Sequence, residues 1–219
     1  MIVLAGTIGA GKTSLTSLLA HHLQIPAFYE SVDDNPVLPY FYQDPQKYAF
    51  LLQIYFLNKR LGQLKQADPQ QESVMDRSIF EDSLLFHLNA DLGRSTETEV
   101  SVYDALLQNM MEELPHTAYK KRPDLLIHIN ISFETMLKRI KKRNRPYEQI
   151  EQDSSLYPYY QELNQRYQTW YENYHESPKM QIDGDQYDFV TDELARKKVL
   201  QLVDQKLTTL PILLHQTAN

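Results

Sequence analysis

The sequence predicts an α/β fold in which a parallel five-stranded sheet is flanked by helices. Short β-rich runs alternate with segments whose apolar residues recur at helical spacing, a pattern typical of parallel sheets. The run at 124–131 is apolar enough for a central strand buried on both faces. No repeat, low-complexity segment or linker divides the chain, so we expect one domain over residues 1–219.

The elements follow one another in order. A first strand runs into a glycine-rich turn, and leucines at helical spacing then predict a helix that Ile25-Pro26 ends. Residues 31–45 are rich in Asp, Asn and Pro and predict an ordered loop before a long helix, which Asp68-Pro69 closes. We expect strands at 2–5, 27–29, 73–75, 124–131 and 179–182, and later helices around 103–114, 160–174 and 191–208.

The composition argues against several classes of site. The chain has no cysteine, which excludes disulfides, thiolate metal sites and cysteine nucleophiles and fits a cytoplasmic location. A net charge of −7 argues against broad nucleic-acid binding. No apolar run approaches the roughly 20 residues of a membrane span, and the start lacks the marks of a signal peptide. We therefore expect neither a nucleic-acid nor a membrane partner.

The strongest motif is the phosphate-loop pattern G-x-x-x-x-G-K-[ST]. Its glycines let backbone N–H groups point at phosphate oxygens, and the following helix directs its positive end at the same anion. The lysine reaches the β- and γ-phosphates, while the final hydroxyl is offered to Mg²⁺. The predicted site for ATP and Mg²⁺ consists of Gly6, Thr7, Ile8, Gly9, Ala10, Gly11, Lys12 and Thr13.

Polar residues end two further predicted strands. Glu30 ends the second strand, and Asp76 and Arg77 end the third. In a parallel sheet these positions lie beside the phosphate loop, where ligands collect. A carboxylate there can accept the proton of an attacking hydroxyl, and an arginine can neutralise charge on the transferred phosphoryl group. We therefore predict a small-molecule kinase.

A basic run follows the best strand and one helix. We interpret it as a mobile lid over about 139–150, whose Arg143 and Arg145 close on the ATP phosphates. The ordinary alternative for such a run is a solvated helix face.

Taken together, these motifs resemble the deoxyribonucleoside kinase family, and especially the bacterial deoxyadenosine/deoxyguanosine kinases. The similarity runs from Ile2 to about Tyr171. The motifs that carry it are GTIGAGKT at 6–13, Tyr29-Glu30, Asn35-Pro36, Phe41-Tyr42, Ala49-Phe50 with Gln53, Asp76-Arg77-Ser78, and the lid segment from Arg139 to Glu148.

The resemblance implies transfer of the γ-phosphate of ATP to the 5′-hydroxyl of a deoxyribonucleoside. Glu30 would be the general base, Arg77 would lie close to the 5′-oxygen, and Asp76 would lie near Mg²⁺. Many relatives carry Glu at the Asp76 position, so the metal contact can be direct or through water. The family also buries apolar helix faces in a homodimer, which implies that the faces at 46–61 and 100–114 form such an interface.

The resemblance further implies which side chains bind the acceptor. Gln53 would bond the base edge and Phe86 would stack on the base, in a pocket that Phe41 helps to build. Tyr42 and Glu148 would bind the sugar 3′-hydroxyl. In the family, an Arg–Asp pair such as Arg60 and Asp82 marks enzymes for purine deoxynucleosides or deoxycytidine, and we favour deoxyadenosine, with deoxyguanosine and deoxycytidine as alternatives.

Two other functions fit a phosphate loop. A nucleoside monophosphate kinase of the thymidylate type needs an extra basic group for the acceptor's phosphate, and the acidic segment 31–45 offers none. A nucleotide switch would hydrolyse ATP without an acceptor. A non-catalytic binding module is disfavoured because candidates for base, metal ligand and lid are all present.

Overall fold

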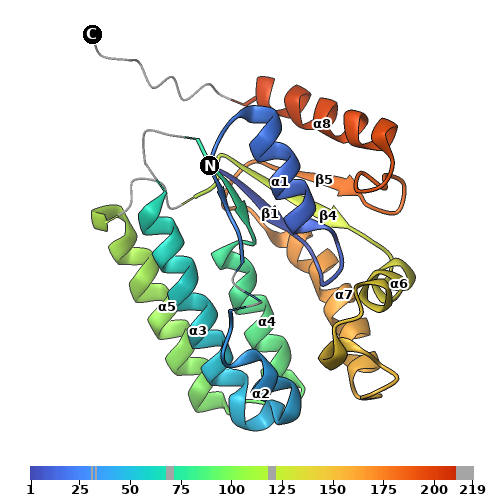
Figure 1. Ribbon diagram of the computed structural model, residues 1–219. Coiled ribbons are helices and arrows are strands. Elements are labelled where there is room, and N and C mark those ends of the chain that lie inside the picture. Colours follow the sequence, from blue (N-terminus) through green and yellow to red (C-terminus); the bar gives the residue numbers. More distant parts are fainter. Residues whose placement is uncertain (31, 33, 68–71, 118–121, 211–219) are drawn as a thin grey trace.

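The computed structural model shows an open sheet of parallel strands with helices on both faces (Figure 1). It describes residues 1–210 apart from 31, 33, 68–71 and 118–121, so residues 211–219 of the predicted domain lie outside the described part. In the order β2-β3-β1-β4-β5, the strands are Ala27–Phe28, Val74–Asp76, Ile2–Ala5, Leu125–Asn130 and Lys179–Asp183. The predicted five-stranded parallel sheet is confirmed, and no strand end moves by more than one residue.

The helices alternate with these strands along the chain. A short 3-10 helix, η1, spans Pro146–Glu148. The α-helices are Lys12–Leu23 (α1), Leu38–Gln43 (α2), Pro45–Gln66 (α3), Ile79–Asp91 (α4), Glu97–Thr117 (α5), Phe133–Arg143 (α6), Leu156–Asn173 (α7) and Glu193–Thr208 (α8).

The segment 31–45 is not the loop that the sequence predicts, because it contains α2. The side-chain oxygen of Asn35 accepts hydrogen bonds from the N–H groups of Val37 and Leu38, at 2.9 and 3.1 Å, and so starts the turn. A proline occupies the first turn, where its missing N–H costs no intrahelical bond. Leu38 and Phe41 are buried against α3. Two apolar anchors are too few for periodicity to reveal a helix of six residues.

The spacing of apolar residues does not predict helix α4 either, although the sequence at its start contains a capping motif. Ser78 and Glu81 form a capping box, in which the Glu81 carboxylate accepts the N–H of Ser78 at 2.8 Å. Only two residues, Arg77 and Ser78, therefore separate the end of β3 from the start of this helix.

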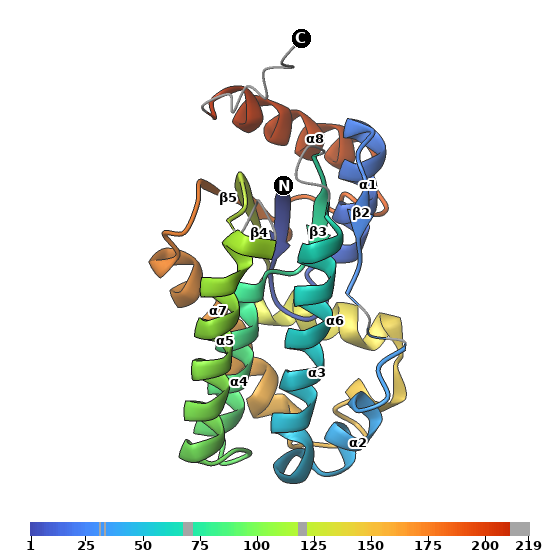
Figure 2. The same cartoon turned by 90° about the vertical axis from the view of Figure 1, so that its left-hand side faces the viewer.

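The two faces of the sheet are covered by different helices. Along β1, Ile2 and Leu4 belong to the core that α1 and α8 complete, whereas Val3 and Ala5 face the core built with α3, α4 and α5. Figures 1 and 2 both show α3, α4 and α5 packed side by side and extending beyond the sheet. This extension carries α2 and forms one wall of the candidate site.

The apolar faces of 46–61 and 100–114, on which the dimer prediction rests, pack in part against each other inside the chain. Side chains of α3, including Phe50, Ile54 and Leu57, share a core with Tyr103 and Leu106 of α5. Leu51 of α3 and Val102 of α5 remain exposed, and a homodimer stays a prediction. Among the described residues, no helix has the length and apolar character needed to cross a membrane.

The carboxyl ends of the strands meet at one edge of the sheet. The phosphate loop follows β1, Glu30 lies two residues beyond β2, and Asp76 is the last residue of β3. Parallel strands expose such ends on a common edge, where α/β proteins bind ligands.

Candidate active site

The phosphate loop depends on three glycines with positive φ. Gly9 and Gly11 have φ values of 77° and 101°, in the region that other residues rarely adopt. Gly6 has φ 146°, and a Cβ built there would lie 2.7 Å from the carbonyl oxygen of Ile129 in β4. The loop therefore tolerates no side chain at this point, because the neighbouring strand passes directly beside it.

Lys12 lies inside the curl of the loop. Its ammonium donates to the carbonyl oxygens of Gly6 and Thr7, at 2.7 and 3.1 Å. Burial, together with the nearby Arg77 cation, lowers its pKa to about 8. The cation is thus placed where phosphate oxygens would be attracted to the loop.

Thr13 and Asp76 bring a hydroxyl and a carboxylate together at the start of α1. The Thr13 hydroxyl donates to Asp76 Oδ2 at 2.5 Å. The other oxygen, Oδ1, is buried and accepts no hydrogen bond from any described residue. Hydroxyl and carboxylate oxygens are ligands that Mg²⁺ prefers, so the donor set fits this ion.

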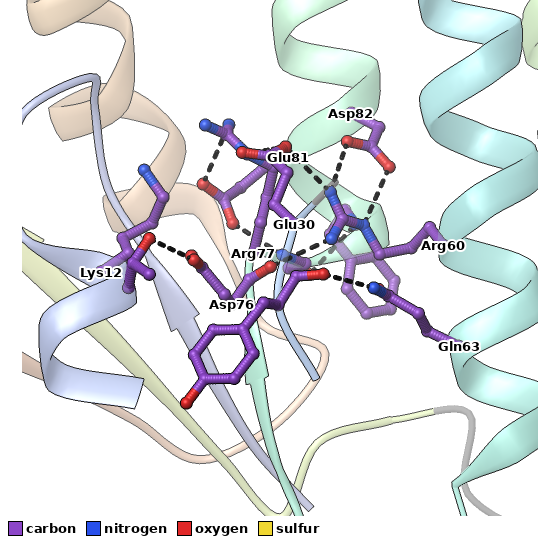
Figure 3. Close-up of polar contacts among 12 residues, drawn as sticks. Lys12, Glu30, Arg60, Gln63, Asp76, Arg77, Glu81 and Asp82 are labelled. Carbon is purple, nitrogen blue, oxygen red and sulfur yellow. Dashed lines mark hydrogen bonds and ion pairs between the residues drawn. The ribbon is translucent and has the colours of Figure 1, made fainter. Parts of the chain in front are cut away.

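Glu30 lies at the centre of a buried cluster of charges (Figure 3). Its Oε1 is 2.7 Å from Nε of Arg77 and accepts a hydrogen bond from Nη2 of Arg60 at 3.3 Å. Burial by itself would raise the pKa of the Glu30 carboxyl, but Arg77, Arg60 and Lys12 outweigh it, so the pKa is lowered. Glu30 is therefore ionised at neutral pH.

Arg77 is held in an unusual backbone conformation. Its φ of 83° is left-handed, which costs a non-glycine residue about 1–3 kcal/mol that the surrounding contacts must offset. Its N–H donates to the carbonyl of Leu4 at 3.0 Å, and the capped start of α4 follows at once. The turn directs the guanidinium toward Glu30.

Arg60 and Asp82 form the buried pair that the resemblance implies, but they do not line the cavity. Arg60 Nε donates to Asp82 Oδ2 at 3.4 Å, and Arg60 Nη1 donates to the carbonyl of Asp76 at 3.0 Å. Burial raises the pKa of Asp82 to about 6 despite the adjacent Arg60. In this structure Arg60 contacts Glu30 and does not face the cavity in which a base would bind.

One continuous cavity of about 890 Å³ runs from the phosphate loop to α2 and α3. Its wall includes both charges of the ion pair, Glu30 and Arg77. Phe41, Tyr42 and Gln53 line the end away from the loop, and the Gln53 side-chain oxygen is buried with no hydrogen-bond partner among the described residues. An unused amide oxygen in an apolar pocket is suited to a polar group of a ligand.

Phe86 is not brought to this cavity. It is fully buried between Phe50 and Tyr103, with ring centroids 6.0 and 4.7 Å away, and does not belong to the lining. Stacking on a base would require this core to rearrange, so that role stays a prediction. The predicted and observed positions differ because an aromatic residue in an apolar helix is suited to core packing as well as to stacking on a base.

The predicted lid residues lie together at the cavity. Arg143 donates to Glu148 Oε2 from Nε and Nη2, at 3.0 and 2.5 Å, and Arg145 lies 3.6 Å from Oε1. Glu148 is buried in η1, and all three residues line the cavity. The residues predicted for phosphate and sugar binding thus form one ionic cluster.

Sequence reasoning placed Arg139 in the predicted lid without a contact of its own, and it missed the loop after β5. Arg139 of α6 donates to the carbonyls of Gly9 and Ala10, at 3.3 and 3.0 Å, and to that of Gly184 at 2.8 Å. The loop 184–191 after β5 also lines the cavity, through Gly184, Asp185, Asp188, Val190 and Thr191. The basic run identified Arg139 as part of the lid, whereas the loop after β5 carries no motif.

The chain matches known proteins over most of its length. A family model described as deoxynucleoside kinase matches residues 2–208. A deoxyguanosine kinase of Lactobacillus acidophilus is 58% identical over 207 residues, which cover 94% of this chain and 90% of that protein. A deoxyadenosine kinase of the same organism is 56% identical over 207 residues, which cover 94% of this chain and 96% of that protein.

Solved structures support the same comparison. The deoxyadenosine kinase from M. mycoides with bound dATP has a TM-score of 0.77 at 30% identity, with 95% of this chain and 99% of that one covered. The same enzyme with dCMP and dCDP bound has a TM-score of 0.74 at 27% identity, with 93% and 98% covered. The predicted P-loop kinase fold is confirmed.

Proposed function

The chain belongs to the deoxynucleoside kinase family, and we propose that its preferred acceptor is a purine deoxynucleoside, deoxyadenosine first. As an ATP-dependent kinase of this family, it transfers the γ-phosphate of ATP to the 5′-hydroxyl of a deoxyribonucleoside and yields the 5′-monophosphate. The predicted reaction is confirmed, and the findings favour it over a monophosphate kinase or a nucleotide switch.

The position of the Glu30–Arg77 ion pair supports the proposed chemistry. The pair lines the cavity between the phosphate loop and the pocket that contains Gln53. As the 5′-oxygen attacks the γ-phosphorus, the ionised Glu30 accepts its proton and the bond to the β,γ-bridging oxygen breaks. Arg77 neutralises negative charge at the reacting oxygens.

We assign the donor contacts to the loop and the lid. Backbone N–H groups of residues 6–13 and the Lys12 ammonium hold the ATP phosphates, and Arg143 and Arg145 leave Glu148 to reach them when the lid closes. Thr13 and Asp76 would hold Mg²⁺, which when bound offsets charge on the phosphate oxygens.

We assign binding of the nucleoside to the acceptor pocket. The Gln53 amide offers one donor and one acceptor to the base edge. Tyr42 and Glu148 are assigned to the 3′-hydroxyl, with Phe41 as an apolar wall. The preference for a purine rests on similarity to kinases named for deoxyguanosine and deoxyadenosine.

An assay of ADP release tests the acceptor directly. The panel contains the four common deoxynucleosides and their 5′-monophosphates, with ATP and Mg²⁺ constant. We expect the highest kcat/KM with deoxyadenosine, then deoxyguanosine, and no turnover with monophosphates. A preference for thymidine would contradict the purine proposal, and ADP release without any acceptor would identify a nucleotide switch.

A homodimer and a cytoplasmic location complete the proposal. The dimer rests on the family resemblance, and light scattering of the purified chain tests it because a dimer has twice the chain mass of 25.7 kDa. The location rests on the absence of cysteine and is tested by fractionation of the source cells.

A further inference from the structure

We infer that Glu81 and Tyr167 are positioning residues for phosphoryl transfer, which hold the Arg77 guanidinium beside Glu30 and tie it to the phosphate loop. The inference rests on the proposed role of Arg77. Neither Glu81 nor Tyr167 lines the cavity, so both act through residues that do.

Glu81 connects three parts of the fold through one carboxylate (Figure 3). It is fully buried, and its Oε2 accepts the N–H of Ser78 at the helix cap. Its Oε1 accepts the N–H of Gly6 at 3.2 Å and the hydroxyl of Tyr167 at 2.8 Å, and lies 3.7 Å from Nη1 of Arg77. Capping of the helix uses only Oε2. The second oxygen, Oε1, connects the phosphate loop, α7 and the turn after β3.

Tyr167 completes the connection between Glu81 and Arg77. Its hydroxyl donates to Glu81 and accepts a hydrogen bond from Arg77 Nη1 at 2.8 Å. The ring is buried, and this burial raises the pKa of the hydroxyl well above its usual range. The hydroxyl therefore remains protonated and can serve as donor and acceptor at once.

The result is an arginine fixed along its whole length. The backbone of Arg77 is bound to Leu4, Nε faces Glu30, and Nη1 is bound to Tyr167. A free arginine side chain populates many rotamers, and a displacement of about 1 Å can lower the rate of a transfer reaction about 10²-fold. The two buried partners remove that freedom before substrate binds.

Tyr167→Phe is the sharpest test because it removes one hydroxyl and leaves the ring and the helix cap in place. Glu81→Gln would also disturb the cap. We expect Tyr167→Phe to lower kcat by about tenfold to a hundredfold, with KM for ATP and for the deoxynucleoside changed less than about twofold. The matched control is Tyr174→Phe, which removes a buried hydroxyl bound to Ser177, outside the site. Equal kcat values in the two variants would overturn the inference.

A double-mutant cycle separates positioning from general stabilisation. In an Arg77→Met background, Tyr167→Phe should lower the single-turnover rate no further, since the guanidinium that Tyr167 positions has already been removed. If the rate losses of the two single substitutions multiply in the double variant, the inference is overturned while the role of Arg77 remains. An unchanged rate in Arg77→Met alone would overturn that role as well, so the two failures are distinguishable.

Discussion

The phosphate-binding half of the site and the nucleoside-facing half are built in different ways. The main part of the donor half is one continuous segment, 6–13, whose shape depends on backbone angles that glycine permits. The acceptor half has no such segment. It draws on α2, α3, α4 and the segments that follow β2 and β3. It depends on charged side chains that pair with one another: Glu30, Arg60, Arg77, Glu81 and Asp82.

The difference affects how each half responds to substitution. A loop defined by its backbone presents N–H groups to phosphate, whichever nucleoside accepts it, and changes little when a distant side chain is replaced. A cluster of mutually paired charges has no independent member, because removing one leaves its partner buried without compensation. We therefore expect acceptor-half substitutions to affect turnover and leave ATP binding almost unchanged.

Of these substitutions, Glu30→Gln should show the largest difference between its effect on kcat and its effect on ATP binding. Loss of the general base should lower kcat by about 10²–10⁴-fold, whereas the dissociation constant of ATP should change less than about twofold. Steady-state assays and calorimetric titration with ATP measure the two quantities. Glu97→Gln, at an exposed position in α5, is the matched control and should behave as the parent. A parallel loss of ATP affinity would show that the halves are not separable, and an unchanged kcat would remove Glu30 from the mechanism.

Gln53→Leu should sharpen the comparison within the acceptor half. The variant removes the amide predicted to read the base, so kcat/KM for the deoxynucleoside should fall by about 5–150-fold, equivalent to about 1–3 kcal/mol. KM for ATP should be unchanged. The melting temperature should not fall, because the Gln53 oxygen accepts no hydrogen bond from the described residues. An unchanged kcat/KM would show that Gln53 does not bind the base.

The acceptor half should also respond to mild acid. Burial raises the pKa of Asp82 to about 6, so Asp82 gains a proton as the pH falls through 6 and no longer balances the charge of Arg60, which contacts Glu30. At pH 5, about a tenth of Asp82 stays ionised, and kcat/KM for the deoxynucleoside should be about tenfold lower than at pH 7. Asp82→Asn should lack this acid limb. Persistence of the limb in that variant would assign it to another group.

Arg139→Lys tests whether the donor half is as self-contained as its sequence indicates. Lysine keeps the charge but cannot reproduce the planar fork that binds three carbonyls, so the dissociation constant of ATP should rise by about threefold to tenfold. KM for the deoxynucleoside should stay constant. The control is Lys141→Met, on the same helix as Arg139, which removes an exposed ion pair with Glu151. Equal ATP affinity in both variants would contradict a role for Arg139 in the loop.

The sequence predicts local features well. All five strands lie within one residue of their expected bounds, and the pattern at 6–13 identifies the phosphate loop, because backbone curvature there is encoded by adjacent residues. Strand ends also place Glu30 and Arg77 correctly at one edge of the sheet. These predictions need only periodicity and the rule that parallel strands share a carboxyl edge.

Long-range contacts are what the sequence does not provide. Nothing near Phe86 indicates that Tyr103 would bury it, and nothing near Arg60 indicates a bond to Glu30. Glu81 is recognisable as a capping residue, but its contact with Gly6 joins residues 75 positions apart in the chain. Helix α2 depends on burial against α3, which a six-residue window cannot show.

The contacts of Arg139 have a consequence for the polarity of the phosphate loop. A peptide unit is planar and trans, so its C=O and N–H bonds point in opposite directions. Because Arg139 binds the carbonyl of Ala10, the N–H of Gly11 in the same peptide unit points away from that guanidinium. One side chain of α6 therefore fixes the orientation of a peptide dipole in the loop, with the carbonyl end toward Arg139 and the N–H end away from it.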